Sequence, residues 1–195
     1  MNRRSLIALI VSAPLLLGQA SASTAEAQAR LKTAVDEVLS VSNRVSSRNA
    51  LAESARPVLQ KHISFETMTR RAVGVGWRQF SAAQQQKATQ LFTTLVIRTY
   101  SNKFTPGEKA SVDFQSAVAP AAGRVDVPTT LVYKGSRYSV TYRMEQVGGG
   151  WRIVDVVIEG VSMVANYRTQ LDATFKKGGA AAVITSLEQS VSRPQ

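Results

Sequence analysis

The side chains that could perform catalysis are few, and their spacing does not fit a common catalytic site. The chain has one histidine, His62, and no cysteine. A Ser-His-Asp triad would have to use His62, yet Ser64 beside it lies in no nucleophile-elbow motif. Zinc sites need several His or Cys ligands, and no HExxH motif occurs. The sequence therefore predicts neither a nucleophilic hydrolase nor a metal site.

Two carboxylates, Asp155 and Glu159, fall on one face of a predicted strand, four residues apart. At the rise of a β-strand they are about 13 Å apart, whereas paired glycosidase carboxyl groups lie roughly 5–9.5 Å apart. We interpret Glu159 as a buried or rim partner of an arginine, and Asp155 is a second candidate for the same role. No Gly-rich phosphate loop is present either, so these residues give no positive sign of catalysis.

Apolar side chains suggest a different kind of function, an internal binding cavity. The candidates are long or aromatic residues placed where predicted helices and strands meet. They are Trp77, Phe92, Val96, Tyr100, Tyr142, Val161, Val164 and Tyr167. Residues of these types also fill ordinary cores, and a cavity requires a sheet that curves enough to leave its centre open. Both interpretations, a binding site and a filled core, stay open at this point.

Helical periodicity covers most of the first half of the chain. Ser81 and Gln84 fit a capping box, and a broad apolar stripe follows them. Gly74 is expected to end the helix before it, and Pro57 to kink an earlier helix or start a new turn. The predicted helices are residues 24–42, 51–63 with a kink or a new turn at Pro57, 65–73, and 82 to about 100.

The period of the apolar residues changes to two after residue 110, which predicts strands. Short turns at Lys134-Gly135-Ser136 and Gly148-Gly149-Gly150 imply antiparallel pairing. Pro128 indicates an edge or a bulge. The four predicted strands are residues 112–119, 124–133, 137–147 and 151–159.

The order of these elements predicts one α+β domain. Its helical part spans residues 24–107, its sheet residues 110–160, and its C-terminal helices residues 162–192. Ser162 is a plausible N-cap, and Gly178-Gly179 is expected to break the last helix in two.

Charge and the N-terminal segment bear on the compartment and the partner. The net charge is +11, which favours an anionic partner such as nucleic acid, a membrane surface or phosphate head groups. Residues 1–22 have a basic start, an apolar run too short to span a membrane, and the small residues of a cleavage site. We therefore predict a cleaved signal peptide, a mature chain of residues 23–195, and export, which argues against nucleic acid.

Three segments resemble the MlaC, or toluene-tolerance (Ttg2), family of periplasmic phospholipid carriers. They are F-E-T-M-T-R-R-A-V-G-V-G-W-R-Q-F-S from Phe65, the helix L-F-T-T-L-V-I-R-T-Y ending at Tyr100, and G-G-W-R-I-V-D-V-V-I-E-G-V-S-M-V-A-N-Y-R-T-Q. Their order and spacing agree together, and the likeness extends from about Leu51 to the C-terminal helix.

The resemblance implies a fold of the NTF2-like kind, a strongly curved four-stranded antiparallel sheet packed with N-terminal and C-terminal helices around an apolar cavity. It also implies a monomeric carrier in a Gram-negative periplasm that holds phospholipid acyl chains, with Tyr100 and Val161 at the pocket. Its expected partners are an inner-membrane MCE-type ABC transporter complex and an outer-membrane lipoprotein–porin complex. No catalysis, cofactor or metal is implied.

Three alternatives stay open. A carrier of another lipid, such as a hopanoid, would use the same fold with a different pocket. An NTF2-like isomerase would use an Asp base, here Asp155, with Tyr138 and Tyr142 as hydrogen-bond donors. A structural envelope protein would have a filled core.

Overall fold

The structure is a computed structural model that describes residues 15–193 of the 195-residue chain, with side chains from residue 23 onward. Within this part, helices come first, then strands, then a final helix, so the predicted α+β fold is confirmed. Residues 1–14 of the predicted signal peptide lie outside the described residues. Residues 15–22 form the start of the first helix, and cleavage after Ala22 stays a prediction.

The first two helices pack against each other and carry one departure from the prediction. They are α1 (Leu15–Ser42) and α2 (Arg48–His62), and the Oγ atom of Ser47 caps α2. Of the two outcomes expected at Pro57, a new turn is wrong, because α2 continues through this residue. A proline inside a helix costs about 3 kcal/mol. Burial of Leu51 and Ala55 before Pro57, and of His62 after it, keeps both halves of the helix in place.

The next helices follow the local signals closely. The helix α3 (Phe65–Val73) ends at Gly74, whose φ is 75°, and the 3-10 helix η1 (Gly74–Gln79) follows. The helix α4 (Ala82–Ser101) begins with the predicted capping box, in which Ser81 and Gln84 each accept a hydrogen bond from the other's backbone amide.

The sheet has six strands within residues 15–193, and all its named pairings are antiparallel. The strand order is β1-β3-β4-β5-β6, with β2 also on β3. A register shift between Arg143 and Met144 interrupts the β4–β5 ladder. The strands are β1 (Ala110–Phe114), β2 (Val118–Ala121), β3 (Arg124–Tyr133), β4 (Ser136–Val147), β5 (Gly150–Ile158) and β6 (Val161–Ser162).

The prediction of four strands is wrong, partly because the first predicted strand is broken. Phe114 lies opposite Thr129, whereas Val118 lies opposite Asp126, so β1 and β2 pair with different parts of β3. The carbonyl of Pro128 accepts a hydrogen bond from the Gln115 amide. In an antiparallel ladder the N–H of a residue points to the same neighbour as its carbonyl, and proline has no N–H to donate. The edge strand therefore loses its pairing at this point.

The sixth strand arises from a tight turn after β5. Ile158 and Val161 lie opposite each other, and Glu159 and Gly160 between them have φ values of 49° and 77°. Positive φ at both central residues is typical of a type I′ hairpin turn. The helix α5 (Met163–Ser192) follows directly with Ser162 as its N-cap, and it is kinked at Gly178 and Gly179 as predicted.

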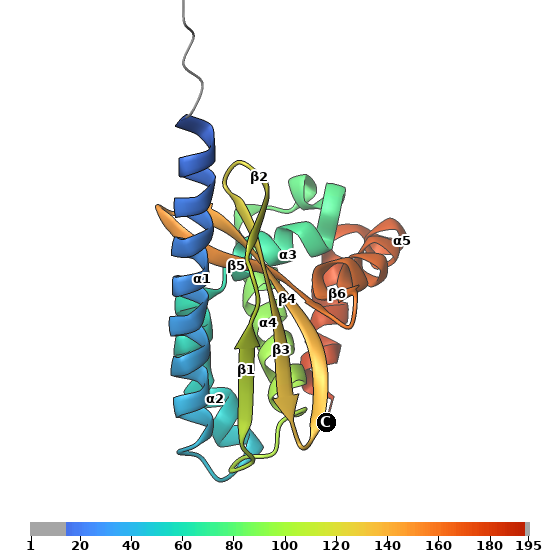
Figure 1. The fold of residues 1–195 in the computed structure, drawn as a ribbon. Helices are drawn as coiled ribbons and strands as arrows, with labels where there is room; N and C mark the ends of the chain where they lie inside the picture. Colours follow the sequence, from blue (N-terminus) through green and yellow to red (C-terminus); the bar gives the residue numbers. More distant parts are fainter. Residues whose placement is uncertain (1–14, 194–195) are drawn as a thin grey trace, which may run out of the picture.

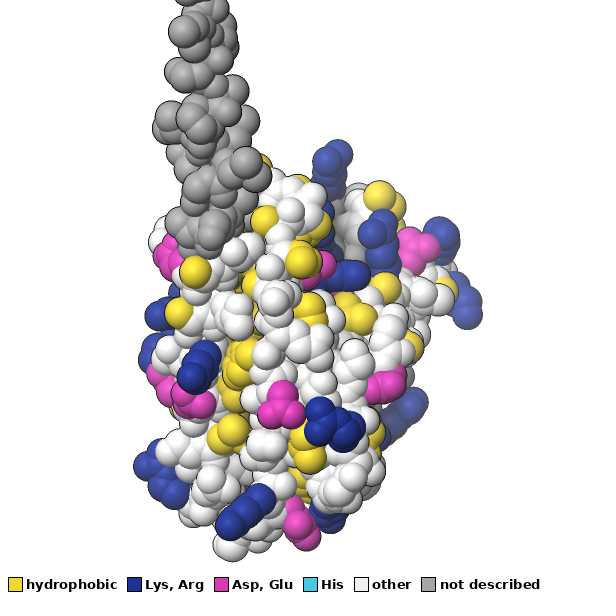
Figure 2. All heavy atoms as spheres, viewed as in Figure 1, with side chains coloured by type: hydrophobic (Ala, Val, Ile, Leu, Met, Phe, Trp, Pro, Cys, Tyr) yellow, Lys and Arg dark blue, Asp and Glu magenta, His cyan; other side chains and the backbone are white. Residues whose placement is uncertain are grey.

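The buried apolar side chains form two clusters. One lies among α3, η1, α4 and α5, and the other lies between α1 and the sheet. In Figure 1, α1 and α5 lie on opposite sides of the molecule with the sheet between them. Figure 2 shows apolar side chains gathered along the line where α1 meets the neighbouring strands. No helix in the described part of the chain is long and apolar enough to span a membrane.

Candidate functional site

A pocket of about 650 Å³ lies between the helices and the sheet. Its walls come from α1, α2, the end of α4, the strands β3 to β6 and the start of α5. Most of the lining side chains are aliphatic or aromatic. A cavity of this size and character is typical of a site for a small apolar ligand.

The helical wall is built by two amphipathic faces. From α1 come Leu31, Val35 and Val38, and from α2 come Ala55 and Leu59, at spacings of three or four residues. None of these was a candidate in the sequence, although their helical periodicity was visible. What the sequence could not show is that the two stripes face a common space rather than closing on each other.

The sheet wall is built by alternate residues of two strands. Val140 and Tyr142 lie on β4, and Val156 and Ile158 lie opposite Tyr142 and Val140 on β5. Burial raises the pKa of the Tyr142 phenol to about 12. Tyr142 is therefore neutral near physiological pH, and it adds no charge to this wall.

The structure divides the eight candidate residues into two groups. Val96, Tyr100, Tyr142 and Val161 line the pocket. The other four do not lie on its wall, and they pack in or against the helical core. Phe92 contacts Tyr167 edge to face, with ring centroids 5.0 Å apart. Trp77, Phe92 and Val164 are each buried in this core, with Tyr167 against it. Contact with a ligand stays a prediction for the first group.

Position along α4 explains why some candidate residues of this helix line the pocket and one does not. Phe92 lies in the part of α4 that packs against α5, whereas Val96 and Tyr100 lie one and two turns further on, where the pocket begins. Burial also raises the pKa of the Tyr100 hydroxyl, so this residue is another neutral phenol in the wall.

The pocket opens to solvent where its lining side chains are exposed. Val161 is 62% exposed and Tyr138 is 38% exposed. Lys103, after the end of α4, and Asn166, in the first turn of α5, are also exposed lining residues. We call these four residues the mouth of the pocket.

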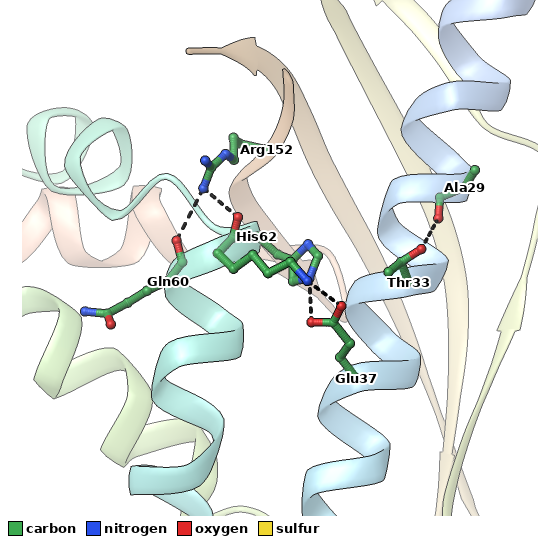
Figure 3. A network of polar contacts seen from close by, with 7 residues as sticks. Ala29, Thr33, Glu37, Gln60, His62 and Arg152 are labelled. Atoms are coloured by element: carbon green, nitrogen blue, oxygen red, sulfur yellow. Dashed lines mark hydrogen bonds and ion pairs between the residues drawn. The ribbon is translucent and has the colours of Figure 1, made fainter. Parts of the chain in front are cut away.

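A polar cluster fixes α1 against α2 beside the pocket (Figure 3). Glu37 of α1 lies 2.6 Å from Lys61 Nζ and 3.0 Å from His62 Nε2. Hydrogen bonds from Lys61 and His62 lower the pKa of the Glu37 carboxyl. Because a carboxylate only accepts hydrogen bonds, His62 must donate through Nε2. Arg152 of β5 donates to the carbonyls of Gln60 and Lys61 at the end of α2.

Asp155 has three partners and lies outside the pocket lining. It accepts hydrogen bonds from Arg143 Nη1 at 3.1 Å, from Ser162 Oγ at 2.6 Å and from the Val164 amide at 3.1 Å. The interpretation of Asp155 as the partner of an arginine is confirmed. Glu159 instead accepts a hydrogen bond from the Ser139 amide. Asp155 thus holds the start of α5 and does not face the pocket as a free base would.

Comparisons with known proteins agree over most of the chain. The sequence model of a family described as MlaC protein matches residues 30–189. The toluene tolerance protein ttg2D of Pseudomonas putida is 21% identical over 180 residues, which is 91% of this chain and 84% of that protein. The Haemophilus influenzae intermembrane phospholipid transport system binding protein MlaC is 23% identical over 158 residues, 75% of this chain and 71% of that one.

One solved structure is similar in fold and in sequence. It is the phospholipid-binding protein from Ralstonia solanacearum in complex with a phospholipid. The TM-score is 0.79 and the identity 26%, over 85% of this chain and 97% of that protein. The similarity therefore extends over most of the helices and strands of this chain.

Proposed function

Because the chain belongs to the MlaC family, we propose that it is a carrier that holds the acyl chains of a phospholipid in the apolar pocket. The observation that carries this proposal is the pocket of about 650 Å³ with its apolar lining and four exposed lining residues at its mouth. The similar R. solanacearum protein was solved with a phospholipid, which supports the same class of ligand here.

The pocket needs a sheet that bends away from the helices. We infer a strongly curved sheet of the NTF2-like kind. The register shift between Arg143 and Met144 supports this inference, because an irregular ladder bends and twists more than a regular one. The break between β1 and β2 at Pro128 also supports a bent sheet, because it interrupts the pairing at the edge.

The energetics explain why a lipid needs such a carrier. An acyl chain of about 16 carbons, at roughly 0.8 kcal/mol per CH₂, costs on the order of 12 kcal/mol to expose to water. A preformed apolar pocket removes most of that cost without chemistry in the carrier itself. Loading and release then depend on docking partners.

We place this carrier in the periplasm of a Gram-negative cell, exported by a cleaved N-terminal signal peptide. It would shuttle phospholipid between the outer and inner membranes as the binding component of an MCE-type ABC transport system. Its partners would be the inner-membrane transporter complex and an outer-membrane lipoprotein–porin complex. The family resemblance and the predicted signal peptide at residues 1–22 support these steps.

A carrier function without catalysis fits the side chains around the pocket. Asp155, the base that an isomerase would use, already binds Arg143, Ser162 and the Val164 amide. It would have to leave these partners before it could accept a proton from a substrate. We therefore propose that the protein is not an enzyme and needs no cofactor.

The direct test is to purify the protein from the periplasm and identify the lipids that copurify by mass spectrometry. A diacyl phospholipid in a fixed ratio to protein is the expected result. A hopanoid would instead favour the alternative lipid carrier. Protein that carries no lipid, and takes up none from phospholipid vesicles, would contradict the proposed function.

A further inference from the structure

The mouth of the pocket carries three polar side chains that have no hydrogen bond or ion pair to another residue within the described part of the chain. They are Lys103, Tyr138 and Asn166. They come from three elements, the segment after α4, the strand β4 and the helix α5. All three can donate a hydrogen bond, and Lys103 is positively charged. They therefore present donors at the opening of an otherwise apolar pocket.

Lys103 is the single lysine or arginine among the described lining residues, and no aspartate or glutamate lines the pocket. A charge at this position is not needed to contain an acyl chain. Its aliphatic stem can lie along the apolar wall while the ammonium group stays in water. This places a cation where the head group of a lipid would emerge.

The segment that carries Lys103 is held in place by the sheet. The Lys103 amide donates to the Tyr100 carbonyl, and the Thr105 amide donates to the hydroxyl of Tyr133 at 2.7 Å. Phe104 contacts the ring of Tyr133 edge to face, with centroids 5.2 Å apart. Because the residues on both sides are fixed, the position of the Lys103 backbone relative to the hairpin of β3 and β4 is also fixed.

Lys103 has no carboxylate partner in the described part of the chain, and the acidic residues of the adjoining segments pair elsewhere. Glu108 is paired with Lys134 at 3.8 Å, and Asp113 is paired with Arg137 at 3.4 Å on the face of the sheet opposite to Tyr138. Glu159, in the turn before Val161, accepts from the Ser139 amide. The charge of Lys103 is therefore not compensated by a neighbouring carboxylate, and an anionic group at the mouth would provide that compensation.

The register of the strands relates Tyr138 to the wall and to Val161, and Asn166 lies one turn into the helix that follows Val161. Tyr138 precedes Val140 by two residues on β4, so the two side chains share a face. Val140 lies opposite Ile158, and Ile158 lies opposite Val161 at the mouth. Asn166 follows Met163, another lining residue, by three positions on α5.

We propose that Lys103, Tyr138 and Asn166 form a head-group subsite that binds the phosphodiester of the lipid whose chains fill the pocket. Lys103 supplies the positive charge, and the Tyr138 hydroxyl and Asn166 amide donate to phosphate oxygens. This inference rests on the proposed function, and it adds that the carrier distinguishes a phospholipid from a neutral lipid with the same chains.

The test is a loading experiment with vesicles that contain phosphatidylglycerol and diacylglycerol with identical acyl chains in equal amounts. The protein is separated from the vesicles, and its bound lipids are quantified by mass spectrometry. The variants are Lys103→Gln and Tyr138→Phe. The matched control is Lys109→Gln, which removes an exposed lysine that does not line the pocket.

The wild-type protein and Lys109→Gln are expected to be enriched in phosphatidylglycerol. Lys103→Gln should lower this enrichment by about two- to fivefold, the range of an exposed ion pair. Added salt should lower the enrichment of the wild type in the same direction, because it screens the Lys103 charge. Wild-type protein that takes up both lipids in the vesicle ratio would overturn the head-group subsite while leaving the lipid carrier intact. Wild-type protein that takes up neither lipid would overturn both proposals.

A soluble phosphate could also be the true ligand of these donors. Glycerol phosphate added in excess distinguishes this case, because it offers the same phosphate without acyl chains. We expect it to leave the bound phospholipid in place. Displacement of phospholipid by glycerol phosphate in the wild type, with no displacement in Lys103→Gln, would overturn the assignment to a lipid head group.

Discussion

Ile158 and Val161 lie directly opposite each other across the two-residue turn between β5 and β6. Ile158 belongs to the sheet wall of the pocket, and Val161 stands at the mouth with 62% of its surface exposed. The turn that joins them uses positive φ values at Glu159 and Gly160. A wall residue and a mouth residue are thus held in a fixed relation by the backbone, so the edge of the pocket is rigid where α5 begins.

This relation predicts that Val161→Glu abolishes lipid retention without unfolding the protein. The new carboxylate would lie at the mouth against the apolar chains, would repel the lipid phosphate and would compete with it for Lys103, while an exposed position tolerates the substitution. Lipid content is measured by extraction and mass spectrometry, and folding by circular dichroism. Val75→Glu is the control, because Val75 is 76% exposed and lies outside the pocket lining. Wild-type lipid levels in Val161→Glu would exclude Val161 from the site.

The helical wall leads to a second prediction, that Ala55→Phe reduces lipid binding by filling the pocket. Ala55 is 3% exposed and lines the pocket from α2, so a larger side chain there would occupy space that the acyl chains need. Overpacking a closed core costs about 1–3 kcal/mol, and free space in the pocket should lower that cost.

The measurement for Ala55→Phe is the amount of phospholipid taken up from vesicles, together with the free energy of unfolding in urea. Ser54→Phe is the matched control, since Ser54 is the exposed neighbour of Ala55 and does not line the pocket. Undiminished uptake by Ala55→Phe, with a folded protein, would show that the lipid does not occupy the α1–α2 side of the cavity.

Local sequence signals predicted the elements well, but they could not predict which of them enclose the pocket. The capping box of Ser81 and Gln84 and the glycine stop at Gly74 depend on neighbouring residues, and both are confirmed. The continuity of α2 through Pro57 depends instead on tertiary burial of Leu51 and Ala55. The break between β1 and β2 could not be predicted without knowing which neighbouring strand Pro128 faces.

Only part of the candidate site was predicted, because local signals do not show how distant elements pack. Val96 and Tyr100 were chosen from the apolar stripe of α4, and so was Phe92, because periodicity alone does not show where the stripe leaves one helix and meets another. The α1 and α2 walls were missed because an amphipathic face identifies burial, whereas a pocket depends on how two such faces are separated. That separation is set by contacts distant in sequence, such as Glu37 with His62.

The depth of Tyr142 predicts its titration. Burial raises its pKa from 10.0 to about 12, so in the folded state its phenol should ionise well above pH 10.0. In the unfolded chain this phenol ionises near pH 10.0, before it does so in the folded protein. The contribution of neutral Tyr142 to the free energy of unfolding is therefore complete below pH 10.0 and is lost as the pH rises through about 12. Tyr142→Phe should remove this part of the alkaline loss.

The measurement for Tyr142 is an alkaline titration followed by phenolate absorption, together with urea unfolding at neutral pH and above pH 10. The wild type and Tyr142→Phe should have similar stabilities near neutrality, because the Tyr142 hydroxyl has no hydrogen bond to another residue in the described part of the chain. An absorption change assigned to Tyr142 that is complete near pH 10 would mean that its phenol reaches solvent.

The polar link between α1 and α2 predicts how the stability of the fold changes at acid pH. Glu37 binds Lys61 and His62, and these hydrogen bonds lower its pKa below the ordinary 4.5. A lowered pKa means that the link stabilises the fold above about pH 4.5 and is lost as the pH falls through the folded-state value. Glu37→Gln should therefore unfold at lower urea concentration than the wild type near neutral pH, and the difference should shrink under acid conditions.

Urea unfolding as a function of pH measures this effect, and Asp36→Asn supplies the control. Asp36 is the exposed acidic neighbour of Glu37 on α1, and no residue in the described part of the chain pairs with it. Its removal should leave the pH profile of the wild type almost unchanged. Because α1 and α2 form one wall of the pocket, Glu37→Gln should also release bound lipid faster near neutral pH than Asp36→Asn does. A gap between Glu37→Gln and the wild type that stays constant from neutral to acid pH would contradict a role for the Glu37 charge.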